Sequence, residues 1–389
     1  MKADVLVIGA GSAGLAAAVA AARAGARTVL VERHGFAGGM GTASLVHTLC
    51  GLYLQDGDEP VWSNPGTLAE EIGRRMEMAT GLGPVRAGRV WFLPQHPVVF
   101  AGLADALLRE AGVEVLFHCE LITLEPGWRA RVLCRGAGMD IEARAVVDAS
   151  GDAVAAAAMG VGHAMTDATS LQRPAYVCGV QGVAGGIDGL GLAGRIIDGI
   201  RAGDLPGAAT GMHFRASGRP GEVFATLDLA GVERGAYDPT DPRCLAALEV
   251  TGREVAMAVV ACLQRTAPGW EGAFISHWPA RAGVRESRRW LGEAVLTGED
   301  VMAGRSFADE VAVASWPLEL RETHRGPRLR YPAGPAGIPR GALVARGHER
   351  LFVAGRCLSC DHEAQASIRV MGTCFATGDA AGRMAAGGV

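Results

Sequence analysis

The chain has 389 residues, of which 49% are hydrophobic and 20% are charged, and its formal net charge is −4 at pH 7. This composition is sufficient for a large hydrophobic core and excludes a disordered polymer. The length predicts two domains, and the weakly acidic balance excludes an electrostatic surface for nucleic acid or an anionic membrane. Because no run of about 18 apolar residues occurs, we expect no membrane-spanning helix.

Two residue types limit the chemistry and the location. Lys2 is the only lysine, so no lysine is available to form a Schiff base, and cationic roles fall to arginine or histidine. The nine cysteines are scattered through a long chain in which we expect no secretory leader. This pattern predicts reduced thiols and a cytoplasmic protein, and His and Cys do not fall in the spacings of a metal site.

The first 33 residues are the unit around which we expect the chain to be organised. Ala3–Gly9 is an apolar, β-branched run that predicts a buried parallel strand, and an alanine-rich helix is predicted to end near Arg23. Between them, Gly9 permits a tight turn, Gly11 lets a pyrophosphate approach the backbone, and Gly14 lets helix and strand pack closely. The alternative, glycines of an ordinary turn, does not explain the strand, helix and second strand that arrive in order around them.

The second strand, Thr28–Glu32, indicates which nucleotide is bound. It ends in an acid about 20 residues beyond the glycines, where dinucleotide folds place the carboxylate that binds a ribose hydroxyl. An acid there favours the free 2′-hydroxyl of FAD or NAD over the 2′-phosphate of NADP. The glycine-rich loop that follows, residues 33–42, is predicted to lie against the cofactor.

The remaining elements fall into three blocks. Up to residue 165 the sequence predicts helices at 67–78 and 97–112 and strands at 113–117, 121–124, 130–134 and 141–148. From 166 to 340 it predicts strands at 175–180 and 222–227 and helices at 195–201 and 241–266. The last block predicts a strand at 350–355, a polar turn at 357–364 and a small-residue helix at 368–386. Residues 189–194 repeat the glycine pattern, but polar residues precede them, so we predict a turn and no second nucleotide site.

With these pieces in place, the chain resembles the FAD-dependent oxidoreductases of the glutathione-reductase-like flavin fold, akin to the flavin core of heterodisulfide reductase. The resemblance is carried by residues 4–25 with Glu32 and the glycines at 38–39, and by residues 146–153, 283–309 and 351–382. It implies an α/β fold with a Rossmann-like FAD-binding domain and an inserted mixed α+β substrate domain. It also implies bound FAD, with the turn from Arg356 to Thr373 beside the isoalloxazine ring. We separately predict that the FAD is bound non-covalently.

We therefore predict a discontinuous FAD-binding domain of residues 1–51, 95–165 and 340–389, and a substrate or cap domain of residues 52–94 and 166–339. The predicted cofactor-binding residues are Gly9, Gly11, Ser12, Ala13, Gly14, Glu32, Arg33, Gly39, Met40, Gly151, Asp152, Gly355, Arg356, Ser367, Ile368 and Met371. The chain departs from the family pattern in the pair Gly355-Arg356, where many relatives carry Gly-Asp. A second departure is Cys357-Leu-Ser-Cys360, which is either a redox dithiol or two unpaired thiols in a turn.

Candidate catalytic residues come from three places. His362 and Glu363 lie in the predicted C-terminal turn, and His47 lies with Cys50 on one face of a possible helix at 44–51. Histidine titrates near neutral pH and suits a base, although each histidine could equally be structural. His47 or Cys50 could alternatively anchor a flavin covalently. Arg285 and Arg369 are candidates for binding a carboxylate or developing negative charge.

Two functional classes stay open. The first is a self-contained FAD enzyme that oxidises or reduces a small organic metabolite by hydride transfer at flavin N5. The second is an electron-transfer subunit that works with a partner protein. We predict a small-molecule substrate, no nucleic-acid or membrane partner, no metal, and possible homo-oligomerisation. The sequence does not identify the substrate.

Overall fold

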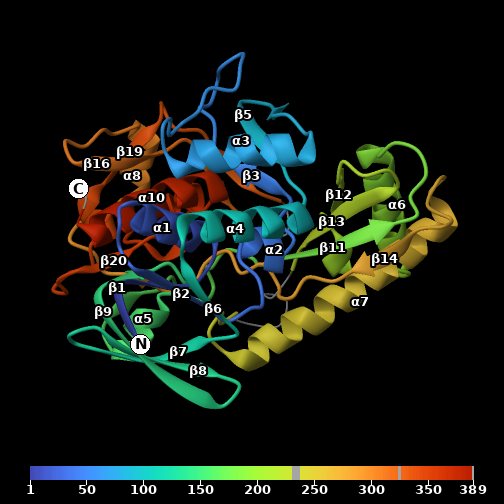
Figure 1. Ribbon diagram of the computed structural model, residues 1–389. Coiled ribbons are helices and arrows are strands. Elements are labelled where there is room, and N and C mark those ends of the chain that lie inside the picture. The colour runs from blue at the N-terminus through green and yellow to red at the C-terminus, as the bar shows by residue number, and fades with distance from the viewer. Residues whose placement is uncertain (230–236, 323–325, 388–389) are drawn as a thin grey trace.

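The computed structural model describes residues 1–229, 237–322 and 326–387, and it has a mixed α/β fold with a mainly parallel sheet (Figure 1). The first strand, β1 (Lys2–Ile8), lies inside that sheet, with the side chains from Val5 to Val7 fully buried. On one side β1 pairs in parallel with β2 (Thr28–Glu32), which pairs in parallel with β6 (Glu114–Phe117). A strand that is covered on both faces needs apolar side chains at every position. For this reason, the continuous apolar run in the sequence predicted that β1 would be a buried strand.

On the other side of β1 lies β9 (Ala137–Asp148), a long strand with two further partners. Its first half pairs antiparallel with β8 (Arg129–Cys134), which pairs with β7 (Glu120–Glu125). Its second half pairs in parallel with β20 (Leu351–Val353), which returns from the far end of the chain. The carboxyl ends of β1, β9 and β20 therefore meet at one edge of the sheet.

Two helices rich in small residues, α1 (Ser12–Arg23) and α10 (Met371–Ala386), pack against each other beside the sheet (Figure 1). A Cβ added at Gly378 would lie 2.1 Å from the carbonyl oxygen of Ala13, and one added at Gly382 would lie 2.2 Å from a second carbonyl oxygen of α1. Glycine alone permits backbones to approach this closely. The C-terminal helix is thus packed directly on the helix that follows the glycine-rich turn.

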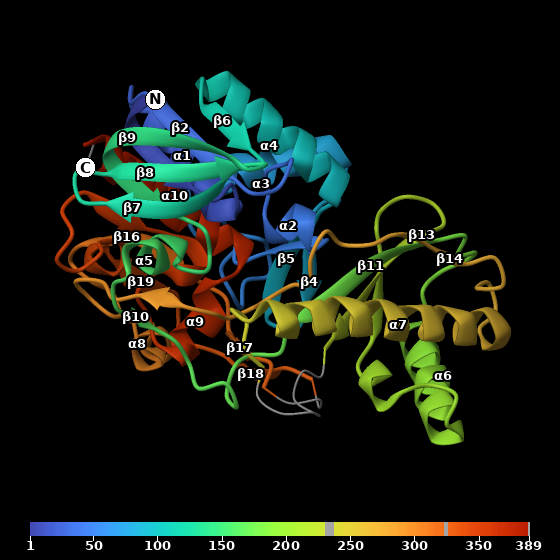
Figure 2. The ribbon, with the colours of Figure 1, turned by 90° about the horizontal axis from the view of Figure 1, so that it is seen from below.

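A second, smaller sheet of antiparallel strands forms a separate lobe at the right of Figures 1 and 2, where the long helix α7 runs along it. The strands and helices of this lobe have a core of their own, which includes Tyr176, Val259 and Trp270. Its strands, in the order in which they pair, are β12 (His213–Ala216), β13 (Glu222–Asp228), β11 (Ala175–Gln181) and β14 (Phe274–His277). Its helices are α6 (Gly189–Ala202), α7 (Pro242–Thr266) and the 3₁₀ turn Gly207–Ala209.

Shorter elements surround the main sheet. A three-stranded sheet contains β3 (Thr48–Cys50), β5 (Val90–Pro94) and β4 (Val85–Ala87). Three strand pairs are β10 (His163–Ala164) with β15 (Arg289–Trp290), β16 (Glu310–Ala314) with β19 (Ala336–Pro339), and β17 (Leu318–Leu320) with β18 (Arg328–Arg330). The remaining helices are α2 (Met40–Ala43), α3 (Leu68–Thr80), α4 (Pro97–Ala111), α5 (Val154–Met159), α8 (Gly298–Ala303) and α9 (His362–Ile368), with 3₁₀ turns at Arg340–Leu343 and Gly355–Cys357.

The hydrophobic cores divide the chain differently from the predicted domains. Residues 52–94 were assigned to the substrate domain, yet Ile72, Met76 and Leu93 belong to the main core. The reason is that α3 is amphipathic and its apolar face lies against the helical layer beside the sheet (Figure 1). Residues 290–339 also contribute to the main core, through side chains such as Leu296 and Ile338, so the second core contains residues from 171 to 284 only.

Three local predictions were wrong. Residues 44–51 are not a helix, because β3 pairs with β5 and places His47 just before a strand. The glycines of 189–194 lie inside α6, where the Asp188 side chain caps the helix by accepting a hydrogen bond from Gly191 N–H. His362 and Glu363 lie in the first turn of α9 and not in a loop, because Asp361 caps that helix.

We expect Gly382→Ala to destabilise the protein because its new methyl group would meet the α1 backbone. Overpacking of this kind typically costs about 1–3 kcal/mol. Gly194→Ala is the matched control: Gly194 is exposed within α6 and an added Cβ would contact nothing within 4 Å, so alanine should stabilise that helix by about 0.5–1 kcal/mol. Thermal unfolding of both variants checks this, and equal effects would contradict the packing argument.

Candidate functional site

A cavity of about 170 Å³ opens at the carboxyl end of β1, where the glycine-rich turn begins. Gly9 has a φ of +91°, and a Cβ added at Gly14 would lie 1.7 Å from the Gly9 carbonyl oxygen. Gly39 approaches the turn from the other side: its φ is +55°, and a Cβ there would lie 2.6 Å from Gly11 Cα. These glycines are required by the backbone, and they leave the start of α1 open to a ligand.

Glu32 closes one side of this cavity at the end of β2. Its buried carboxylate accepts hydrogen bonds from Ala10 N–H (2.7 Å) and His34 N–H (2.9 Å). These contacts fix the carboxylate between the glycine turn and the loop that follows β2. The arrangement matches the ribose-binding acid of dinucleotide folds.

Asp152 lines the same cavity and links it to a second one. Its carboxylate lies 2.7 Å from the guanidinium of Arg356 and accepts a hydrogen bond of 2.6 Å from the Ser287 hydroxyl. Burial alone would raise the pKa of Asp152, but Arg356, Ser287 and Arg33 outweigh that effect and lower it. Asp152 is therefore ionised at neutral pH.

The second cavity has a volume of about 420 Å³ and adjoins the first. Gly39 lines the first cavity and the next residue, Met40, lines the second; likewise Asp152 lines the first and its partner Arg356 the second. Its walls come from the β3-β5-β4 sheet, the antiparallel sheet of the second lobe, the β17-β18 pair and the start of α10. The two cavities are therefore neighbours, linked by Gly39 and Met40 and by the Asp152–Arg356 pair.

A model of the FAD dependent oxidoreductase family matches residues 4–388. The chain belongs to this family. Accordingly, this FAD-dependent oxidoreductase binds FAD, and the glycine turn, Glu32 and the adjoining cavities fit that cofactor. A search of curated proteins found no match to the sequence.

One solved structure supports the fold, and two others are reported as similar. A triple mutant of the flavin-dependent brominase Bmp2 is 12% identical with a TM-score of 0.50, and the match covers 99% of this chain and 81% of that one. AlpK is 15% identical (TM-score 0.49), with 97% of this chain and 60% of AlpK covered. A geranylgeranyl bacteriochlorophyll reductase-like protein from Thermoplasma acidophilum is 14% identical (TM-score 0.47), with 99% and 77% covered. At these identities the likeness concerns the fold alone.

His47 lines the second cavity of the enzyme as a buried, neutral side chain. Its Nδ1 lies 3.2 Å from the Leu45 carbonyl oxygen, which assigns the proton to Nδ1 and leaves Nε2 unprotonated. The ring stacks on Phe224 with 4.8 Å between centroids. Burial lowers the pKa of His47 to about 3, and the positive charge of Arg215 acts in the same direction. Cys50, on the same wall, has its pKa raised to about 12 by burial and is a neutral thiol.

Arg285 and Arg369 also line the second cavity. Arg285 donates to Asp228 at 2.7 Å, so its charge is already neutralised. Arg369 donates to two uncharged oxygens, the Gln172 side-chain oxygen and the Glu319 carbonyl, both at 3.2 Å. Burial lowers the pKa of Arg369 to about 10.

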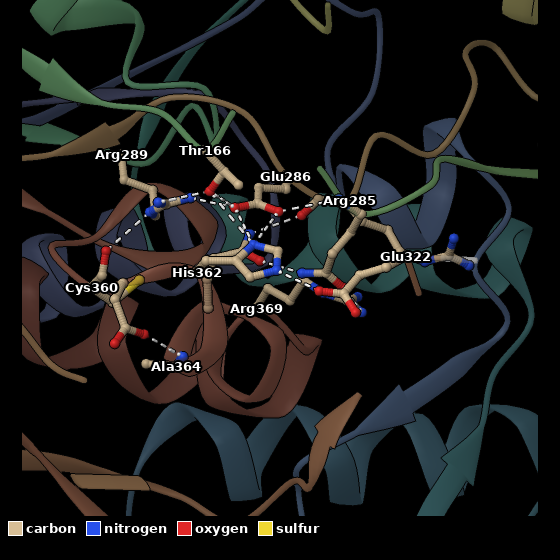
Figure 3. Close-up of polar contacts among 12 residues, drawn as sticks. Thr166, Arg285, Glu286, Arg289, Glu322, Cys360, His362, Ala364 and Arg369 are labelled. Atoms are coloured by element: carbon tan, nitrogen blue, oxygen red, sulfur yellow. Dashed lines mark hydrogen bonds and ion pairs between the residues drawn. The ribbon is translucent and has the colours of Figure 1, made fainter. Parts of the chain in front are cut away.

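His362 and Glu363 lie outside the residues that line either cavity. Figure 3 shows His362 held between two carboxylates: Nδ1 is 2.9 Å from Glu286, and Nε2 is 3.2 Å from Glu322. Although burial opposes it, these acids raise the pKa of His362. Glu363 pairs with Arg330 at 2.6 Å. The two side chains therefore make their contacts within the protein, and the partner of His362 is Glu286, which the sequence could not locate.

The other predicted site residues fall into two groups, those that line a cavity and those that do not. The first cavity is lined by Gly9, Gly11, Glu32, Arg33, Gly39 and Asp152, and the second by Met40, His47, Arg285, Arg356, Arg369 and Met371. The residues that line neither cavity are Ser12, Ala13, Gly14, Gly151, Gly355, Ser367 and Ile368. Cys357 and Cys360 are buried free thiols whose pKa values are raised by burial.

The sequence missed His213, Arg215, Glu319 and Arg321, all of which line the second cavity. One signal was available: His213 and Arg215 alternate along β12, so both face one side of the sheet. Within the described ranges, no three His, Cys, Asp or Glu side chains form a metal-binding group. In the same ranges, none of the helices has the length and hydropathy needed to cross a bilayer.

The buried neutral His47 should make stability depend on pH. The unfolded chain takes up this proton near pH 6.5, whereas folded His47 resists it down to about pH 3, so its contribution to stability is lost as the pH falls below 6.5. Between pH 7 and 5 the wild type should lose about 2 kcal/mol more unfolding free energy than His47→Gln. Urea denaturation of both proteins in excess FAD measures the difference, and parallel pH profiles would contradict it.

Proposed function

We propose that the enzyme oxidises or reduces a small organic metabolite bound in the second cavity. The observation that carries this proposal is the adjacency of a nucleotide-type cavity and a second cavity of about 420 Å³. Bound FAD supplies the redox step, the transfer of a hydride to or from N5. The protein's own residues have to bind the substrate, exclude water and accept or donate one proton.

Residues of the first cavity are proposed to hold the ADP half of FAD. Gly9, Gly11 and Gly14 leave the start of α1 free for the pyrophosphate, and Glu32 accepts from a ribose hydroxyl. Met40 and Met371 both line the second cavity. Met40 follows Gly39 of the first cavity, and Met371 is the first residue of α10. This arrangement supports placing the flavin ring in the second cavity. We propose that no covalent bond holds it, because the two residues considered as anchors, His47 and Cys50, are neutral.

His47 is the proposed proton acceptor. Its unprotonated Nε2 has no hydrogen-bond partner in the described part of the chain, and its ring is held by Phe224 and Leu45. A substrate hydroxyl or amine can therefore donate to Nε2 as its C–H bond is broken. The low pKa of free His47 means that the ring stays unprotonated until that step.

Aromatic and aliphatic side chains complete the cavity, and we propose that they shield the reacting atoms from water. Phe92, Trp316 and Tyr331 line it together with several aliphatic residues. A concave cavity beside the proposed nucleotide site supports a small-molecule enzyme over an electron-transfer subunit, whose substrate would be a protein surface. The glutathione-reductase-type arrangement, the cytoplasmic location and homo-oligomerisation remain predictions from the sequence.

We expect His47→Gln to retain FAD and to slow its reduction by substrate about 10²–10⁴-fold, the range for loss of a general base. The measurement is anaerobic flavin bleaching against a panel of metabolites, followed by stopped-flow with the metabolite that bleaches wild type. His362→Gln is the matched control: it breaks an ion pair with Glu286 outside both cavities, so it should lower thermal stability while the folded holoenzyme reduces at a near-normal rate. Bleaching that requires an added partner protein would contradict the proposal.

A further inference from the structure

The charges around the second cavity do not balance. The arginines that line it are Arg215, Arg285, Arg321, Arg356 and Arg369. Acidic side chains pair with three of them: Asp228 binds Arg285 and Arg321, Glu319 also binds Arg321, and Asp152 binds Arg356. Within residues 1–229, 237–322 and 326–387, Arg215 and Arg369 form no ion pair with a carboxylate.

Arg215 projects from β12 and stacks on an aromatic ring. Its guanidinium carbon lies 4.6 Å from the centroid of Phe92, a ring that itself lines the cavity. Stacking uses the face of the guanidinium and leaves its in-plane N–H groups for an acceptor. No protein acceptor for them is found in the described ranges, and arginine stays protonated even where burial lowers its pKa.

Arg369 adds a second positive charge with incomplete partners. Its side chain is partly buried, its bonds go to uncharged oxygens, and its Nε has no hydrogen-bond partner among the described residues. The charge of Glu319 favours the protonated form of Arg369, but the described residues show no ion pair between the two side chains. An anion bound in the cavity would therefore supply the direct charge partner that Arg215 and Arg369 lack.

A substrate is a better candidate for the anion near Arg215 than the phosphates of FAD, because of where the arginines lie. Arg33 and Arg356 lie at the first cavity and at the junction of the two, beside Asp152. Arg215 comes instead from the second lobe, on the wall that also carries His213 and Thr226. Its charge also acts on His47, the proposed proton acceptor, and so lies near the reacting position.

We propose that the substrate is an organic carboxylate whose carboxylate group is bound by the Arg215 guanidinium and whose apolar body lies against Phe92 and Trp316. This inference rests on the proposed function, because it names the substrate class of the same site. A planar guanidinium binds a carboxylate through two parallel hydrogen bonds, which also fixes the orientation of the ligand. Arg369 completes the positive field that draws the anion into the cavity.

Calorimetric binding of benzoate and benzamide to the FAD-loaded enzyme tests the inference, since the two probes share shape and differ in charge. Loss of charge-assisted hydrogen bonds of about 1.5–3 kcal/mol corresponds to about 10–100-fold in affinity. Benzoate should therefore bind at least about 10-fold more tightly than benzamide. Arg215→Met should remove that preference, weakening benzoate by about 10–100-fold with little change for benzamide.

Arg305→Met is the matched control, because Arg305 stacks on Phe307 at 5.2 Å but lies outside the cavity. It should bind benzoate like wild type, and FAD content with thermal stability verifies that each variant is folded. Equal binding of the two probes, or unchanged benzoate affinity in Arg215→Met, would overturn the inference, as would loss of FAD from Arg215→Met. Binding is measured on oxidised enzyme without turnover. A failure of the carboxylate inference is therefore distinguishable from a failure of the proposed function, which is tested by flavin bleaching.

Discussion

The close packing of α1 on α10 is the contact on which the rest of the structure depends. Gly378 and Gly382 let the C-terminal helix lie directly against the helix of the glycine-rich turn. Because of this approach, residues 369–371 at the start of α10 lie beside the cavity that Met40 lines from the other end of the sequence. A larger residue at either glycine would separate the two halves of the site.

A second constraint is the balance of buried charge. Asp148 illustrates a satisfied case: its buried carboxylate accepts from Ser150, Ala155 and Trp290, which holds the end of β9 in shape. Glu286 is satisfied in the same way by His362 and Arg289, and this cluster fixes α9 (Figure 3). By contrast, Arg215 and Arg369 of the second cavity form no ion pair in the described ranges, and for this reason we propose that they bind an anionic ligand.

The glycine-rich turn and the acid at the end of β2 could be predicted because their signal is local. Strand, glycines, helix and terminal acid follow one another within the first 33 residues, and each residue type is required by its own backbone or by its immediate neighbours. The parallel sheet could be predicted from the same apolar runs. The family resemblance extended this to the C-terminal strand and helix, which pair with β9 and α1.

The substrate half could not be predicted in the same way. Arg215, Asp228 and Glu319 come from three separate strands, and nothing in the sequence says which arginines will find acidic partners. His362 was a reasonable catalytic candidate by its position in the chain, but its partner Glu286 lies 76 residues away. The hydrophobic cores divide the chain differently from the predicted domains for a related reason, since an amphipathic helix such as α3 does not reveal which core its apolar face will join.

A crystal structure of the FAD-loaded enzyme tests the central claim most directly, namely that the two adjoining cavities are one flavin and substrate site. The account predicts a ribose hydroxyl of FAD hydrogen-bonded to Glu32 and the flavin ring in the second cavity, on the same side as His47 and Arg215. A flavin ring lying outside that cavity, or an adenosine ribose away from Glu32, would contradict it.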